Sequence, residues 1–298
     1  MSREYAAFYQ KSISESPSIG LTMEEIRSQF TNFLQAFPPE DGVRFEPFSI
    51  GNISAFWAFA PNVNRRRILL FFFGGGFCCG SIESHKNLIG RLSATTNAAV
   101  CAIQYRLAPE HPFPAALDDA LTAYRWLLHH PYARSRILFG GISSGANLAL
   151  SLLLRLKLEK IAMPAGALCL CPWIDLSNKT KKGQSDFFTS EWFAYFSEKY
   201  IEGKDPTDPL ISPLYGNFET LPPLFIQSGT HDLFHAEALQ LANSAQKQGV
   251  TVFLDIWPGL SHNFELFAPQ FPEAEEALEK AGEFVEKIFI GKNTQAVH

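Results

Sequence analysis

The sequence predicts an α/β fold built on a mostly parallel β-sheet with helices on both faces. Short apolar runs of strand length recur along the 298 residues, helical patterns separate most of them, and 46% of the residues are hydrophobic. Strands that are apolar throughout are buried on both faces, which is typical of parallel sheets covered by helices. A chain of this length suits one large domain, so residues 1–298 are expected to form a single unit.

Helices and then a hairpin are expected at the start of the chain. Thr22 and Glu25 form a capping box, and apolar residues follow at helical spacing until Pro38. Residues 43–50 and 53–60 then flank a turn at Gly51-Asn52, which predicts a hairpin of two antiparallel strands. The first 40 residues are therefore expected to be helical, before any strand begins.

Six further strands and the helices between them complete the pattern. The strands are expected at residues 68–73, 98–104, 136–139, 167–171, 224–227 and 251–257. The helices are expected at residues 88–94, 115–128, 146–158 and 236–246, with a last one from about 272. Residues 176–218 lack a strand pattern and carry aromatic residues at helical spacing. An insertion between two core strands is where a lid over a site is usually built.

Charge and composition exclude several classes of function. The net charge of −5 gives no general attraction to nucleic acid, and the one basic cluster, at residues 65–67, is interpreted as a solvated turn. The chain starts without a signal-peptide pattern and has no apolar run of membrane-spanning length. Its five cysteines lack disulfide or zinc spacing and are expected to be buried small hydrophobes, so a reducing cytoplasm is expected.

A candidate nucleophile lies between an expected strand and an expected helix. The residues G-I-S-S-G at 141–145 match the pattern G-x-S-x-G, with Ser143 in the middle. Such pentapeptides occur by chance, but a strand before and a helix after are the setting of a nucleophile elbow. In that setting a tight turn pushes the serine hydroxyl out above the sheet.

A serine nucleophile needs a base, an orienting acid and donors for an oxyanion. Asp232 and His262 each follow a later strand, and the chain order Ser, Asp, His is the one that accompanies this elbow. Three glycines at residues 74–76 follow an apolar strand and can bring backbone N–H groups close to a ligand. The sequence therefore predicts a Ser143–His262–Asp232 triad beside a glycine loop.

Further motifs make the chain similar to the hormone-sensitive-lipase family of α/β-hydrolases. The stretch Y-R-L-A-P-E-H-P-F-P-A-A-L-D-D at residues 105–119 follows a family signature almost letter for letter. C-P-W-I-D-L at 171–176, S-P-L-Y at 212–215 and L-P-P at 221–223 also match. The resemblance covers roughly residues 40–290 and implies the α/β-hydrolase fold.

The resemblance also assigns roles to residues. It places Ser143, Asp232 and His262 on the family's triad, and Gly75, Gly76 and Ser144 on its backbone oxyanion donors. It places residues 1 to about 40, together with about 178–218, on the family's helical cap, which shapes the substrate pocket. Aromatic candidates for that pocket are Phe77, Phe187, Phe188, Trp192, Phe193 and Phe264, each of which also fits plain core packing.

The chain departs from the family pattern near the site. Phe73 stands where the family has a histidine before the three glycines, and this change is expected to loosen or re-aim the loop without abolishing the chemistry. Ile142 and Ser144 replace the usual aspartate and alanine of the elbow. Because Ser144 acts through its backbone N–H, its oxyanion role is expected to survive.

The resemblance implies a serine carboxylesterase that cleaves short- to medium-chain esters and needs no metal or organic cofactor. An amidase or deacetylase with the same triad, or a non-catalytic ligand-binding relative, is the alternative. The expected partner is a small-molecule ester, with no nucleic acid and no membrane span. Since members of this family often form dimers, the resemblance leaves a homodimer open.

Overall fold

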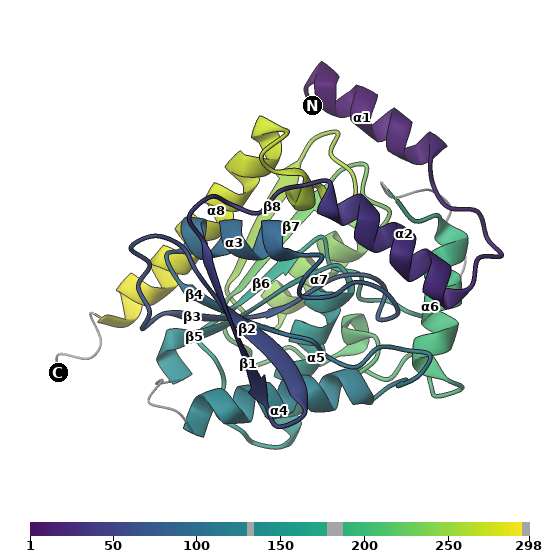
Figure 1. Ribbon diagram of the computed structural model, residues 1–298. Coiled ribbons are helices and arrows are strands. Elements are labelled where there is room, and N and C mark those ends of the chain that lie inside the picture. The colour runs from purple at the N-terminus through teal and green to yellow at the C-terminus, as the bar shows by residue number, and fades with distance from the viewer. Residues whose placement is uncertain (130–133, 178–186, 294–298) are drawn as a thin grey trace.

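A computed structural model of the protein describes residues 1–129, 134–177 and 187–293. Its centre is an eight-stranded sheet in the order β1-β2-β4-β3-β5-β6-β7-β8 (Figure 1). The first two strands pair antiparallel with each other, β2 pairs antiparallel with β4, and all other neighbours are parallel. The strands are β1 Arg44–Ile50, β2 Ile53–Phe59, β3 Ile68–Phe72, β4 Ala99–Ile103, β5 Ile137–Ile142, β6 Ala167–Leu170, β7 Leu224–Gly229 and β8 Val252–Trp257. The predicted hairpin and mostly parallel sheet are confirmed.

Helices cover both faces of this sheet. Helices α3 (Lys86–Thr96) and α8 (Pro272–Asn293) pack together over one face, and α4 (Ala115–His129) and α5 (Ser144–Leu158) lie over the other (Figure 1). Helix α7 (His235–Lys247) packs against β7 and β8. All residues of β3, β4, β5, β6 and β7 are buried, which explains their unbroken apolar sequences. The five cysteines are free and buried, as predicted.

Three helices lie outside these two layers, on one side of the molecule (Figure 1). They are α1 (Arg3–Ser14), α2 (Met23–Gln35) and α6 (Ser190–Ile201). The predicted capping box begins α2: the Glu25 N–H donates to the Thr22 hydroxyl, and the Thr22 N–H donates to the Glu25 carboxylate. The Trp192 indole of α6 donates to the carbonyl of Pro17 at 2.9 Å, which ties the two helical segments together. Residues 178–186 of the expected cap lie outside the described residues.

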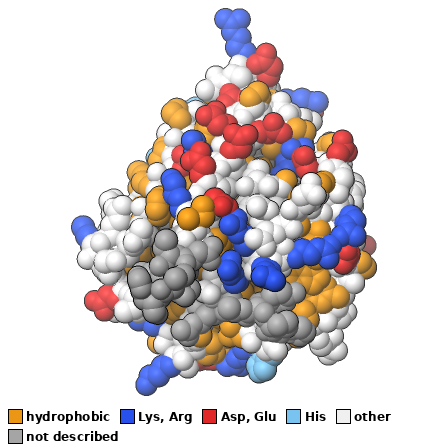
Figure 2. Space-filling model, turned by 90° about the vertical axis from the view of Figure 1, so that its left-hand side faces the viewer, with side chains coloured by type: hydrophobic (Ala, Val, Ile, Leu, Met, Phe, Trp, Pro, Cys, Tyr) orange, Lys and Arg blue, Asp and Glu red, His pale blue; other side chains and the backbone are white. Residues whose placement is uncertain are grey.

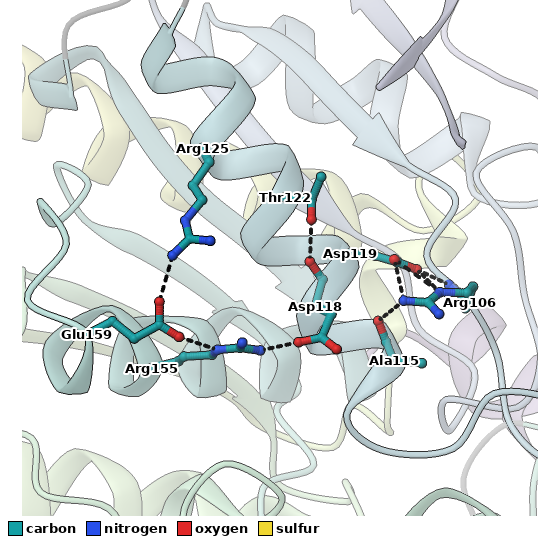
Figure 3. Close-up of polar contacts among 8 residues, drawn as sticks. All are labelled: Arg106, Ala115, Asp118, Asp119, Thr122, Arg125, Arg155 and Glu159. Atoms are coloured by element: carbon teal, nitrogen blue, oxygen red, sulfur yellow. Dashed lines mark hydrogen bonds and ion pairs between the residues drawn. The ribbon is translucent and has the colours of Figure 1, made fainter. Parts of the chain in front are cut away.

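Ion pairs explain why residues 105–119 form one unit (Figure 3). The guanidinium of Arg106, in the loop after β4, donates to both carboxylate oxygens of Asp119 on α4, at 2.9 to 3.1 Å. Since the Asp119 side chain is buried, this bidentate pair anchors the loop to the helix. Arg155 of α5 bridges Asp118 of α4 and Glu159, the C-cap residue of α5.

The basic cluster at residues 65–67 is only partly solvated. Arg67 is 7% exposed, pairs with Glu286 of α8 and lies over the ring of Phe289, 5.2 Å from its centroid. The interpretation as a solvated turn is therefore wrong for Arg67, because its aliphatic stem and charge are both used in packing α8. Lys and Arg side chains share the surface in Figure 2 with clusters of Asp and Glu. Across the described ranges, every helix is too short or too polar to cross a membrane.

Candidate active site

Ser143 lies in a strained turn between β5 and α5. Its backbone has φ 56° and ψ −120°, a conformation that non-glycine residues rarely adopt. Gly145, two residues later, permits the turn because a Cβ there would lie 2.1 Å from the carbonyl oxygen of Phe72. The strand, the sharp turn and the helix that begins at Ser144 have the form of a nucleophile elbow.

The structure brings Ser143, His262 and Asp232 together in one hydrogen-bonded line. The Oγ of Ser143 lies 2.8 Å from Nε2 of His262, and Nδ1 of His262 lies 3.0 Å from Oδ1 of Asp232. All three residues are buried, and they come from the carboxyl ends of β5, β7 and β8. This geometry suits a hydroxyl activated by an imidazole that a carboxylate orients.

Asp232 is held as a carboxylate despite its burial. Burial alone opposes its ionisation, but His262, the N–H of Phe234 and the thiol of Cys171 together lower the pKa of the carboxyl below its usual value. The Phe234 N–H donates to Oδ1 at 2.8 Å. The rings of Phe193 and Phe234 meet the His262 ring edge-on and cover part of it. A negative charge is therefore available to orient the imidazole.

The glycine loop lies beside the elbow. Gly75 has φ 126°, and a Cβ there would lie 2.3 Å from the carbonyl oxygen of Cys79, so only glycine fits. In the described chain, the N–H groups of Gly75 and Gly76 donate to no protein atom. Ser144 is the first residue of α5, so its N–H is one of the free donors of the helix. Its hydroxyl accepts from the Phe77 N–H at 3.3 Å, which joins loop and elbow.

A histidine from farther along the chain supports this loop. Nε2 of His85 accepts from the Gly74 N–H at 3.3 Å, and its Nδ1 lies 3.0 Å from the carbonyl of Ser81. Burial lowers the pKa of His85 to about 4, so the ring is neutral and keeps an acceptor nitrogen. The sequence did not indicate His85, because its role depends on the chain after the glycine loop folding back so that the ring meets the Gly74 N–H.

A small cavity opens beside His262. Its volume is about 20 Å³, room for a single water molecule, and it is lined by Phe30, Phe33, Phe187, Phe188, His262, Asn263, Leu266 and Phe267. Two of the predicted pocket residues, Phe187 and Phe188, are in this lining. The prediction did not include the phenylalanines of α2, although their helical spacing marks one apolar face.

The other four predicted pocket residues lie outside this lining. Phe193 packs on the His262 ring, and Phe77 stacks on Tyr200 with centroids 3.8 Å apart. Trp192 points to Pro17, and Phe264 packs against Trp257. These four side chains pack in the core, because aromatic neighbours cover each of them.

A larger groove lies away from this chemistry. It has a volume of about 750 Å³ and runs between α3 and α8, lined by Thr95, Glu279, Gly282, Glu283, Glu286, Lys287 and Ile290. Among these side chains there is no activated nucleophile and no imidazole. The small cavity at His262 is therefore the candidate active site.

Comparison with known proteins agrees with this fold. Residues 69–266 match the model of a family described as alpha/beta hydrolase fold. An acetyl-hydrolase of Streptomyces hygroscopicus is 37% identical over 253 residues, 83% of each chain. An esterase of Acinetobacter venetianus is 29% identical over 288 residues, 93% of this chain and 94% of that one. The chain belongs to the alpha/beta hydrolase family.

Solved structures narrow the resemblance. The crystal structure of an esterase from the bacterial hormone-sensitive lipase family superposes with a TM-score of 0.90 and 31% identity, over 97% of this chain and 99% of that one. A hormone-sensitive lipase from a metagenome library gives a TM-score of 0.89 and 29% identity over the same shares. The family resemblance inferred from the motifs is thus confirmed.

Proposed function

We propose that this chain is a serine carboxylesterase that cleaves short- to medium-chain carboxylic esters through an acyl-enzyme. The observation that carries the proposal is the line from Ser143 Oγ to His262 Nε2 at 2.8 Å and from His262 Nδ1 to Asp232 at 3.0 Å. The esterases and acetyl-hydrolase among its relatives support an ester as the substrate.

In the proposed reaction, Ser143 attacks the ester carbonyl while its proton passes to His262. The tetrahedral intermediate collapses, and the C–O bond to the alcohol breaks as His262 returns the proton to the leaving oxygen. Water then attacks the acyl-enzyme, gives a proton to His262, and releases the acid with regeneration of the Ser143 hydroxyl. Asp232 holds the imidazole tautomer and stabilises the imidazolium formed in each half.

The N–H groups of Gly75, Gly76 and Ser144 bind the oxyanion in this proposal. In the described chain these N–H groups donate to no protein atom, the Phe77 N–H joins their loop to the elbow, and glycine allows a ligand to approach closely. The free N–H groups at the start of α5 add the positive end of the helix dipole. Loss of one such donor typically raises the barrier by about 3–4 kcal/mol.

Helices α1, α2 and α6, with the chain between residues 178 and 218, form the cap in this proposal. The cavity of about 20 Å³ is far below the roughly 300 Å³ of a pocket that encloses a small ligand, so the structure corresponds to a closed state. Substrate access then requires the aromatic side chains around Phe188 to move apart. The size of the space they open sets the acyl length.

A panel of p-nitrophenyl acetate, butyrate, octanoate and palmitate, with matched anilides and with Ser143→Ala alongside, tests the proposal. We expect hydrolysis of the shorter esters, weak activity on palmitate and on the anilides, and loss of several orders of magnitude in the variant. Equal rates for both proteins on every ester would contradict the proposal. Preference for the anilides would instead support an amidase.

A further inference from the structure

Glu265 is a buried carboxyl group that the proposed reaction does not use. It lies in the short helix η3 (Phe264–Phe267), three residues after His262, with an exposed fraction of 0%. No Lys or Arg in the described chain pairs with it. Burial, aided by the negative charges of Asp232 and Asp255, raises the pKa of Glu265 to about 8, although hydrogen bonds to its own backbone N–H and to Cys171 act in the opposite direction, so the group is neutral near pH 7.

Cys171 lies between this acid and the proposed triad. Its Sγ is 3.4 and 3.5 Å from the two carboxyl oxygens of Glu265. The same sulfur lies within 4.8 Å of a carboxylate oxygen of Asp232 and of a ring nitrogen of His262. The backbone of Cys171 has φ 42°, in the left-handed region, directly after β6. Burial raises the pKa of the Cys171 thiol well above its usual value, so the sulfur keeps its proton.

Asp232 has one oxygen to offer this thiol. Its Oδ1 accepts from His262 and from the Phe234 N–H, whereas its Oδ2 is buried without a hydrogen bond of ordinary geometry. A buried carboxylate oxygen without a donor is costly. The Cys171 sulfur lies within 4.8 Å of an Asp232 carboxylate oxygen, and its thiol helps to lower the pKa of that carboxyl, so the S–H is the candidate donor. A neutral Glu265 can in turn donate its O–H to the sulfur, which leaves the thiol proton for Asp232.

We propose that Cys171 and neutral Glu265 extend the Ser143–His262–Asp232 line by two residues and act as positioning residues for Asp232. The Glu265 O–H donates to the Cys171 sulfur, and the Cys171 S–H donates to Oδ2 of Asp232. This fixes the carboxylate plane that orients His262. The inference rests on the proposed function, because it concerns the same reaction.

The titratable and polar groups that face Glu265 from the neighbouring elements do not neutralise it. Cys171 faces it from the end of β6, Asp232 from the loop after β7, and Asp255 from β8. Asp255 is itself occupied by Gln227 and Trp257, which donate to it at 2.7 Å. From α3 the neighbouring polar group is the uncharged amide of Asn87, which donates to Leu266 and Ala268 carbonyls. The buried side chains of α8 are apolar, namely Ala274, Ala277, Leu278, Ala281, Phe284, Val285 and Phe289.

Ionisation of Glu265 reverses the arrangement. A carboxylate at this position accepts the Cys171 S–H and withdraws it from Asp232, and its charge disfavours the carboxylate beside it. The hydrogen bond to Asp232 is therefore present below about pH 8 and lost above it. Loss of one such bond corresponds to a decrease of about threefold to tenfold in kcat/KM.

The test compares pH profiles of kcat/KM for p-nitrophenyl butyrate between pH 6 and 10 in wild type, Glu265→Gln, Cys171→Ser and Cys171→Ala. We expect the wild-type profile to fall about threefold to tenfold near pH 8. Glu265→Gln can still donate to sulfur but cannot ionise, so its profile should stay level there. Cys171→Ser keeps a donor and should retain most activity, whereas Cys171→Ala should lose about threefold to tenfold at pH 7.

Two results overturn the inference. One is a Glu265→Gln profile that coincides with the wild type, and the other is equal activity of Cys171→Ser and Cys171→Ala at pH 7. Melting temperatures of all four proteins separate loss of folding from loss of orientation, since a purely structural role changes stability and leaves the profile unchanged. Ser143→Ala separates the two proposals: its full activity would refute the proposed function, whereas its inactivity with coinciding profiles would refute this inference alone.

Discussion

The ring of Phe73 stacks on the ring of Tyr105, with 4.1 Å between centroids and 10° between planes. The hydroxyl of Tyr105 donates to the backbone carbonyl of Phe73 at 2.8 Å. The ring of His85 is also near, with its centroid 5.6 Å from that of Phe73. The position before the three glycines is thus held by an aromatic stack, and the loop N–H finds its acceptor in His85.

Replacing His85 by Phe tests this support. The change removes the acceptor for the Gly74 N–H while it keeps a planar ring, so the loop is expected to lose its alignment. We expect kcat to fall about tenfold with little change in KM, because His85 contacts Gly74, the neighbour of the proposed oxyanion donor Gly75, and not the donor itself. Phe73→His in the same background should recover part of kcat. Unchanged kcat in His85→Phe would contradict the role.

Because His85 is buried in its neutral form, we expect the folded protein to lose stability at acidic pH. Burial lowers the pKa of His85 to about 4 from a usual value of 6.5. A lowered folded-state pKa contributes stability that is present above pH 6.5 and lost as the pH falls toward 4. We expect the melting temperature of wild type to drop more steeply over this window than that of His85→Gln. The exposed His129 provides the control, because His129→Gln should follow the wild type.

A methyl group on the glycine loop should be far more harmful than the same change elsewhere. Gly75 and Gly20 have similar φ values of 126° and 114°, but a Cβ on Gly75 would lie 2.3 Å from the Cys79 carbonyl oxygen while Gly20 has open space. Gly75→Ala is therefore expected to lower kcat/KM by about 100-fold or more. Gly20→Ala shares the backbone strain and should stay near wild type. Similar losses in both variants would show that strain, not the loop position, sets the effect.

Arg27 of α2 links the segment after the three glycines to the loop that follows β4, within the stretch of residues 105–119. Its Nε donates to the Cys78 carbonyl at 2.7 Å, and its Nη2 donates to the Ala108 carbonyl at 2.8 Å and to Glu110 at 2.7 Å. We expect Arg27→Met to lower the free energy of unfolding by about 1–3 kcal/mol and to raise KM. The exposed Arg44 pairs with the surface carboxylate of Glu46 at 3.6 Å, so Arg44→Met should change little. Urea titration and steady-state kinetics measure both effects.

Phe188 is expected to limit acyl length. It lies in the cavity wall, and its ring contacts those of Phe30 and Phe196 at 4.9 and 5.0 Å. Phe188→Ala should raise the ratio of octanoate to acetate hydrolysis severalfold, at a cost of about 3–5 kcal/mol in stability. Phe284→Ala removes an equally buried ring on α8 and should destabilise the protein with the ratio unchanged. An unchanged ratio in Phe188→Ala would place the acyl pocket elsewhere.

The sheet, its flanking helices and the positions of Ser143, Asp232 and His262 follow from local signals in the sequence. Unbroken apolar strands predict burial on both faces, and the elbow glycines mark one turn. His85, Cys171 and Glu265 could not be predicted, because each acts through a partner far along the chain. The lining of the small cavity beside His262 was predicted only in part, since an aromatic side chain in a helix packs inward whether it lines a cavity or fills the core.

Covalent labelling tests directly whether Ser143 is the nucleophile. The protein is incubated with diethyl p-nitrophenyl phosphate, and the intact mass and the modified peptide are determined alongside Ser143→Ala. We expect one diethylphosphoryl group per chain, attached to Ser143, with loss of esterase activity in proportion to labelling. Ester hydrolysis that persists in a fully labelled protein, or a label on another residue that tracks the loss of activity, would contradict it.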